Sequence, residues 1–167
     1  MRHVTELLIM YFQLDNPGIH EEIKSLQAAC IAKNPNLKAH CDNVPVEKAH
    51  ITLLAANVQE NQLEKAKKVI ERTLRNQVVQ SVPTEFDIEL RGIDSFGDKI
   101  TYAEVDEGDN HLRLINEKFV DAFEKAGFSC DARFTPHVTL MKVSGGSKSF
   151  PQDLTSFWKY HLTFHFS

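Results

Sequence analysis

The sequence predicts an α+β fold made of two similar lobes related by a pseudo-twofold axis. Strand-like and helix-like segments alternate along the chain in the order β-α-β-α-β-β-α-β. Two of the strand-like segments, each following a helix-like one, carry the related tetrapeptides His50 to Leu53 (HITL) and His137 to Leu140 (HVTL). No boundary-like linker separates the two halves, so we expect a single domain over residues 1–167.

The first half of the chain reads as two strand-helix pairs. Val4 to Leu14 is rich in β-branched and aromatic residues and is followed by Asn-Pro-Gly, which predicts a strand and a turn. Ile19 to Ala32 has apolar residues at helical spacing. Asn34 to Glu47 contains two prolines and has no clear period, so we interpret it as a loop. Ala49 to Ala56 is the next predicted strand, and Gln62 to Val79 is the next amphipathic helix.

The second half begins with a predicted antiparallel hairpin. Glu85 to Arg91 alternates apolar residues that are expected to face inward, and Lys99 to Val105 alternates Ile100 and Tyr102 in the same way. Gly97-Asp98 forms the turn between them.

A third helix and another strand follow the hairpin. Leu112 to Phe128 has a helical apolar face, with Asp109 as the expected N-cap and Gly127 as the stop signal. His137 to Val143 is the next predicted strand. The aromatic-rich segment from Leu154 to Phe166 is ambiguous.

The composition is typical of an ordinary globular protein. The chain has 167 residues, of which 42% are hydrophobic, with 7 Gly, 6 Pro and no low-complexity run, which excludes disordered and fibrous classes. Its formal net charge is -4, whereas sequence-independent binding of long nucleic acid usually needs clustered Lys and Arg. A short nucleotide or an RNA end remains compatible with this charge.

The cysteines and the apolar runs bear on the cellular compartment. Cys30, Cys41 and Cys130 are odd in number and scattered, which argues against a disulfide framework or a zinc knuckle and favours a reducing, cytoplasmic or nuclear location. The apolar run from Leu7 to Phe12 is short, is bracketed by Glu6 and Asp15 and lacks a following small-residue cleavage site, so it fits a strand better than a signal peptide. No run approaches the length of a membrane span. We expect a monomer that does not associate with membranes.

The two His-x-Thr stretches are the candidate catalytic residues. On a strand, residues i and i+2 point to the same face, so His50 projects with Thr52, and His137 projects with Thr139. If the lobes face each other, two imidazoles and two hydroxyls meet. One imidazole can then take a proton from an attacking oxygen while the other protonates the leaving oxygen. The hydroxyls can bond the non-bridging phosphate oxygens, so phosphoryl chemistry needs no metal here.

Less specific interpretations stand beside this one. A single His-x-Thr on a strand is often only a half-buried polar pair. His161-Leu162-Thr163 also fits the pattern, but it lacks the repeated position after a helix, and we interpret it as incidental. His161 and His165 would share a face for zinc only on a helix, whereas KYHLTFHF favours a strand. We therefore expect no metal and no other cofactor.

With both motifs placed, the chain resembles the 2H phosphoesterase superfamily, whose members carry two H-h-T/S-h motifs (h, hydrophobic) about 80 to 100 residues apart. The stretch RFTPHVTLMK, from Arg133 to Lys142, is similar to the second-motif region of the branch that contains the central domain of an A-kinase-anchoring protein. Leu90 to Phe96, followed by Ile100 to Val105, resembles the hairpin of that branch. The likeness runs from about Val4 to Gly146.

The resemblance implies a bilobal fold of antiparallel sheets flanked by helices around a metal-free cleft. It also implies action on 2′,3′-cyclic phosphates or 2′-5′ linkages of nucleotides or RNA. By the same resemblance His50 is the proton donor and His137 the acceptor, with Thr52 and Thr139 holding the phosphate. The residues alone leave the donor and acceptor exchangeable.

The C-terminal segment departs from that branch, in which a further stretch and a final strand complete the sheet. Here the sequence reaches HLTFHFS soon after Phe157-Trp158. Either Tyr160 to Phe166 supplies a shortened strand, or a sheet edge stays exposed.

Residues beside the motifs are candidates for substrate binding. Arg133 and Lys142 are expected to contact phosphate, unless they are solvated charges at strand ends. Phe134 is a candidate for stacking on a base, although the 11 Phe of the chain favour a place in the core for it. Lys48 is expected on the strand face of His50, where it either lowers the proton affinity of that histidine or points to water.

We therefore predict a metal-independent phosphodiesterase that acts by acid-base catalysis with two histidines. The alternative is a nucleotide-binding module, such as a sensor or scaffold, that turns nothing over. A protein-interaction role for the helical faces is a third option, and no exposed apolar stripe in the sequence argues for it.

Overall fold

The computed structural model describes residues 5–97, 99–106, 110–131, 133–143 and 162–163. The strands are β1 (Thr5–Gln13), β2 (Cys41–Asn43), β3 (His50–Gln59), β4 (Asp87–Phe96), β5 (Ile100–Asp106), β6 (Ser129–Cys130), β7 (His137–Val143) and β8 (Leu162–Thr163). The helices are α1 (Pro17–Lys33), α2 (Leu37–His40), α3 (Leu63–Thr73), α4 (Val79–Ser81) and α5 (His111–Lys125). The predicted α+β class is confirmed.

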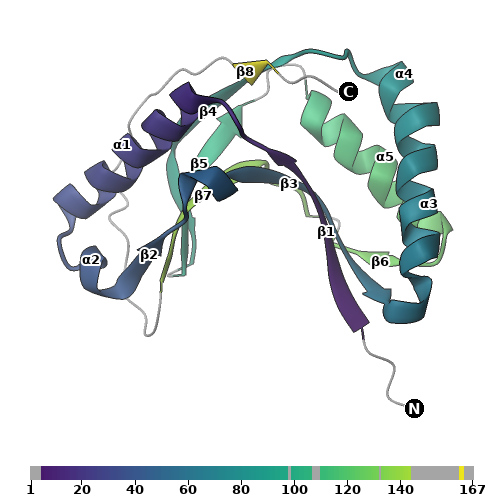
Figure 1. Cartoon of the computed structure of the whole chain (residues 1–167), viewed down its shortest axis with the longest axis horizontal. Helices are drawn as coiled ribbons and strands as arrows, with labels where there is room; N and C mark the ends of the chain where they lie inside the picture. The colour runs from purple at the N-terminus through teal and green to yellow at the C-terminus, as the bar shows by residue number, and fades with distance from the viewer. Residues whose placement is uncertain (1–4, 98, 107–109, 132, 144–161, 164–167) are drawn as a thin grey trace.

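All strands pair antiparallel in a sheet of order β1-β3-β7-β5-β4-β8, with β2 beside β7 and β6 beside β3. Figure 1 shows this sheet as an arch, with α1 and α2 along one outer side and α3, α4 and α5 along the other. No helix of the described residues lies beneath the arch. The described helices therefore all lie on the convex side of the sheet.

The chain repeats one unit twice, as β1-α1-β2-β3 and as β5-α5-β6-β7. In each unit the first strand pairs with the last strand, β1 with β3 and β5 with β7. The short strands exchange partners, because β2 pairs with β7 and β6 pairs with β3. The helices do the same, with α1 packed against β7 and α5 against β3. The predicted pseudo-twofold relation is confirmed, and the exchange of elements ties the two lobes together.

The two units meet where β3 crosses β7. In the described part of the chain these two strands share one paired position, Ile51 with Val138, and both side chains are fully buried. Their neighbours in the core include Leu54, Leu140 and Met141, each 1% exposed or less. Burial of an aliphatic side chain of this kind contributes about 1.5–3 kcal/mol, so the crossing is a stable part of the core.

Each His-x-Thr strand contains a bulge directly after its threonine. Met10 pairs with Leu54 but Tyr11 pairs with Thr52, which leaves Leu53 as an extra residue in β3. In β7, Leu140 is left over in the same way, at the register shift between Thr101 and Tyr102 of β5. The two bulges therefore occupy equivalent places in the two units.

Buried amide side chains satisfy the backbone carbonyls at both bulges. Asn116 of α5 donates from Nδ2 to the carbonyl oxygen of Leu53 at 2.7 Å, and Gln27 of α1 donates from Nε2 to that of Leu140 at 2.9 Å. Gln27 also donates to the carbonyl oxygen of Val44 at 2.8 Å. Both amides are 5% exposed. A buried carbonyl without a partner is costly, so each helix fixes the bulge of the strand that it covers.

Most of the elements expected from the sequence are present, but the loop interpretation of Asn34 to Glu47 is wrong in part. That segment contains α2 and β2, and ends in a short 3-10 turn, Val46–Lys48. Leu37 at the start of α2 is 2% exposed and anchors the segment to the core. Elements of three or four residues are too short to show a period.

The face assigned to β5 is also corrected. Ala103 and Val105, at 0% and 8% exposed, are the residues of β5 in the hydrophobic core. Ile100 and Tyr102 instead lie opposite Phe96 and Asp94 on the concave face. Tyr102 is 4% exposed because aromatic side chains on that face cover it.

The ends of the predicted elements differ slightly from those observed. The N-cap of α5 is Asn110, whereas the expected Asp109 lies outside the described residues. Gly127 has φ +88° just beyond α5, in agreement with its predicted role as a stop. Leu162 and Thr163 pair with β4 as β8; the rest of the ambiguous C-terminal segment, including His161 and His165, lies outside the described residues.

Replacing Asn116 with leucine removes the hydrogen bond that satisfies the Leu53 carbonyl and leaves that oxygen buried. We expect the free energy of unfolding to fall by about 1–3 kcal/mol, as measured by urea denaturation. The control is Asn61→Leu, at an exposed asparagine, which should change it by less than about 0.5 kcal/mol. Equal stabilities for the two variants would contradict the role given to the Asn116 amide.

Candidate active site

The crossing of β3 and β7 brings both His-x-Thr pairs to one patch of the concave face. Because Ile51 lies opposite Val138, antiparallel pairing sets His50 beside Thr139 and Thr52 beside His137. The two histidines are then diagonal neighbours, whose backbones are about 7–8 Å apart. They are close enough for the charge of His50 to act on the pKa of His137.

Both imidazole rings are held in the same way. His50 Nδ1 lies 2.9 Å from the carbonyl oxygen of Lys48, and His137 Nδ1 lies 2.6 Å from that of Thr135. A carbonyl oxygen only accepts, so each Nδ1 carries a proton and donates it. The other ring nitrogen, Nε2, is therefore the one available for proton transfer in both histidines.

A tyrosine accompanies each histidine on the neighbouring strand. Tyr11 lies opposite Thr52 in the register of β1, and its ring centroid is 4.9 Å from that of His50. Tyr102 lies opposite Thr139 in β5, with its ring centroid 5.1 Å from that of His137. Sequence reasoning identified neither tyrosine as part of the site, because the pairing follows only from the strand register.

The two half-sites differ in their exposure to water. Tyr102 is 4% exposed and Tyr11 is 51% exposed. Phe96 stacks on Tyr102, with ring centroids 4.2 Å apart, and meets His137 edge-on at 4.9 Å. The rings of Phe96 and Tyr102 thus form an aromatic wall beside His137, whereas His50 contacts the half-exposed ring of Tyr11.

This wall affects the proton affinity of His137. Burial lowers the pKa of His137 below its ordinary 6.5, and the positive charge of His50 acts in the same direction. The hydrogen bond to the carbonyl of Thr135 opposes the shift, because it favours the charged ring. Burial also raises the pKa of Tyr102, with a further contribution from Asp94, so the tyrosine keeps its proton.

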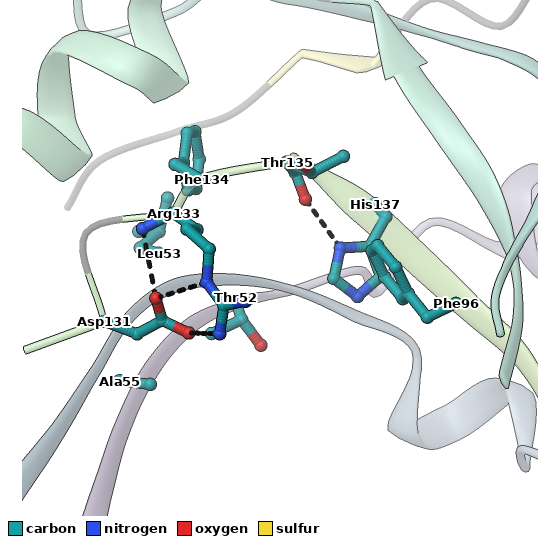
Figure 2. A pocket seen from close by; sticks show the side chains of 9 residues that line it. All are labelled: Thr52, Leu53, Ala55, Phe96, Asp131, Arg133, Phe134, Thr135 and His137. Carbon is teal, nitrogen blue, oxygen red and sulfur yellow. Dashed lines mark hydrogen bonds and ion pairs between the residues drawn. The ribbon is translucent and has the colours of Figure 1, made fainter. Parts of the chain in front are cut away.

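A pocket of about 410 Å³ opens beside His137, within the size range of small-molecule sites. Figure 2 shows the residues that line it: Thr52, Leu53, Ala55, Phe96, Asp131, Arg133, Phe134, Thr135 and His137. Of the residues predicted from the sequence, the pocket thus brings together Thr52, Arg133, Phe134 and His137. His50 and Thr139 lie beside it on the same face but outside its lining.

The predicted substrate-binding residues take different positions. Arg133 is exposed and makes an ion pair with Asp131 through Nε and Nη2, both at 3.2 Å, and this pair lowers the pKa of the Asp131 carboxyl. Phe134 packs against the core and also lines the pocket, with the guanidinium of Arg113 at 5.8 Å from its ring centroid. Phe134 is therefore shared between the core and the pocket lining, and its stacking on a base stays a prediction.

Two lysines are placed away from the pocket. Lys142 is exposed and lies beyond the Leu140 bulge, opposite Asp42 and Ile100 in the strand register. Lys48 belongs to the 3-10 turn before β3, not to the strand face of His50 as expected, and its backbone carbonyl is the group that contacts the histidine.

The described residues contain no group of three or more His, Cys, Asp or Glu that could hold a metal ion. Within the same residues, no helix combines the length and apolar character needed to cross a bilayer.

Comparison with known proteins places the chain in a family. The family model described as AKAP7 2'5' RNA ligase-like domain matches residues 10–167, which extends beyond the Gly146 limit of the resemblance seen in the sequence. Among curated proteins, no sequence matches the chain.

Two solved structures share the fold. The PDE domain of MHV ns2 has a TM-score of 0.67 at 13% identity, and the alignment covers 96% of this chain and 89% of that one. TT0787 of Thermus thermophilus has a TM-score of 0.68 at 17% identity, with coverage of 93% and 83%. The chain therefore shares its fold with both proteins, and the fold that the family resemblance implied, antiparallel strands flanked by helices, is confirmed.

Replacing Phe96 with alanine opens the His137 ring to water, which favours the charged imidazolium. We expect the pKa of His137 to rise toward 6.5 in this variant, as measured by NMR titration of the imidazole signals. Phe96→Leu keeps an apolar side chain at the same place and should shift the pKa much less. An unchanged pKa in Phe96→Ala would contradict the role of the aromatic wall.

Proposed function

The chain belongs to the AKAP7 2'5' RNA ligase-like domain family of the 2H phosphoesterase superfamily, and we propose that it is a metal-independent phosphodiesterase. Its substrates are 2′,3′-cyclic phosphates or 2′-5′ linkages of nucleotides or RNA. The observation that carries this proposal is the crossing of β3 and β7. It sets His50 and His137 on one face with Nδ1 held by a backbone carbonyl in each ring.

In the proposed reaction His137 is the general base. Its lowered pKa keeps the ring neutral near pH 7, so Nε2 has a free electron pair to accept a proton from the attacking oxygen. That oxygen belongs to water when the substrate is a cyclic phosphate, and to the neighbouring ribose hydroxyl when it is a 2′-5′ linkage. As the new oxygen-phosphorus bond forms, the proton passes to His137.

His50 is the general acid in the same scheme. As the bond from phosphorus to the leaving ribose oxygen breaks, protonated His50 gives its Nε2 proton to that oxygen. The tyrosine beside this ring, Tyr11, is half-exposed, whereas the tyrosine beside His137, Tyr102, is buried. The assignment matches the one that the family resemblance implies.

In the proposed reaction the two threonines hold the phosphate between the histidines. Register sets Thr52 beside His137 and Thr139 beside His50, so a phosphate that contacts both rings has a hydroxyl on each side. Hydroxyl donors at these points stabilise the charge that develops on the non-bridging oxygens. Arg133 at the pocket rim is a further candidate for phosphate contact, after exchange of its Asp131 partner.

The pocket beside His137 supports a nucleotide as the bound group. Phe134 and Phe96 supply aromatic surface at its wall, and a base can stack on such surface with little demand for sequence. The formal net charge of -4 favours a short substrate over a long polyanion. A nucleotide or an RNA end is therefore the proposed ligand.

The test is incubation of the protein with a panel of 2′,3′-cyclic nucleotides and 2′-5′ oligoadenylate in EDTA, followed by identification of the products. We expect turnover that EDTA does not reduce, because no step needs a metal. His50→Ala and His137→Ala should each lower kcat about 10²–10⁴-fold, and His40→Ala, on α2, is the control that should retain activity.

The outcome decides between the proposal and its alternative. Nucleotide binding without turnover across the whole panel would instead favour a non-catalytic sensor or scaffold. Turnover that persists in both histidine variants would contradict the assignment of the site.

A further inference from the structure

The concave face of β1 carries an exposed apolar surface. Leu7, Ile9 and Tyr11 are 62%, 47% and 51% exposed, and account for most of the exposed large hydrophobic residues in the described part of the chain. They alternate along the strand, so their side chains share one face. We call these three residues the β1 strip.

The β1 strip adjoins the pocket beside His137. Tyr11 lies opposite Thr52 and Ile9 lies opposite Ala55 in the register of β1 and β3, and both Thr52 and Ala55 line the pocket. Directly opposed residues of paired strands share a face. The strip therefore extends from the pocket beside His137 to the edge of the sheet. In Figure 1 this edge strand, β1, lies at the front of the right-hand side of the arch.

The pseudo-twofold relation shows what distinguishes this surface from its counterpart. Tyr102 and Ile100 of β5 are the equivalents of Tyr11 and Ile9, and β4 lies on their outer side with Phe96 opposite Ile100. Phe96 covers that half-site by stacking on Tyr102. Among the described strands, none pairs with the outer side of β1. One end of the site is closed by an aromatic side chain, and the other end is open along β1.

We propose that the β1 strip binds a third nucleotide, next to the two that the cleaved bond joins, so the preferred substrate is an oligonucleotide of at least three nucleotides. This inference rests on the proposed function. The ring of Tyr11 lies 4.9 Å from that of His50, so an occupant of the strip reaches the catalytic patch directly. An oligonucleotide with one base in the pocket beside His137 would leave the site at its open end, along β1.

The chemistry of the strip favours contact with bases over contact with phosphates. Neither β1 nor β3 contains a lysine or an arginine, so no cation on these strands neutralises a backbone phosphate. Apolar and aromatic side chains pack against the faces of bases and tolerate any base. Binding along the strip should therefore depend weakly on salt compared with binding by basic surfaces.

The experiment measures how affinity depends on substrate length. In the full chain with His137→Ala, in EDTA, fluorescence anisotropy gives Kd for 2′-5′-linked adenylate dimer, trimer and tetramer. We expect the trimer to bind about tenfold more tightly than the dimer. Adding Leu7→Ser and Ile9→Ser should abolish that gain, whereas Val79→Ser, at an exposed residue of α4, should preserve it.

Turnover by the otherwise native chain separates this inference from the proposed function. The Leu7→Ser, Ile9→Ser variant should keep kcat/KM for adenosine 2′,3′-cyclic phosphate and raise KM for the trimer. Equal affinities for dimer and trimer, with cyclic phosphate turned over normally, would overturn the inference alone. Loss of turnover of every substrate by the native chain would overturn the proposed function instead.

A second copy of the protein is the alternative occupant of the strip, and size-exclusion chromatography detects it. The native chain should elute as a monomer at the concentrations of the assay, with or without the serine substitutions. A native dimer that becomes a monomer on Leu7→Ser, Ile9→Ser substitution would assign the strip to contact between two copies and contradict its role in substrate binding.

Discussion

The geometry of the site depends on one antiparallel pairing, between Ile51 and Val138 at the crossing of β3 and β7. Both side chains are fully buried, and side chains alternate along a strand with a period of two. A slip of one residue in either strand would therefore turn its histidine into the core and bury a polar ring without a partner. The apolar residues that flank each histidine thus fix which face it occupies and how far it lies from the other.

The repeat in the fold supplies two equivalent histidines, and their surroundings make them different. Each ring donates a hydrogen bond from Nδ1 to the backbone carbonyl two residues earlier in the chain. Each ring also contacts a tyrosine of the neighbouring strand. Phe96 covers only the His137 side. In the proposed reaction this difference in solvation divides the roles of base and acid, as it does for other pairs of titratable groups that share a site. The same asymmetry leaves the β1 side of the cleft open.

Sequence reasoning predicted the face of each motif because His-x-Thr periodicity within a strand is local. It also located most of the elements, including β7 with its observed bounds. It did not predict the Leu53 and Leu140 bulges, the amides of Asn116 and Gln27 behind them, or the pairing of Tyr11 and Tyr102 with the histidines. Those features depend on the register between strands that are distant in the sequence and on which helix covers which strand. A short stretch of sequence predicts neither. The placement of Lys48 was wrong for a related reason, since a 3-10 turn of three residues leaves no periodic signal.

The claim that two imidazoles act on one phosphorus atom is tested most directly by a crystal structure of the protein with a nucleoside 2′-monophosphate bound. The account predicts one phosphate group with His50 Nε2 and His137 Nε2 both within hydrogen-bonding distance of its oxygens, and with Thr52 and Thr139 on either side. A phosphate that contacts only one of the two rings, or that binds away from the crossing of β3 and β7, would contradict it.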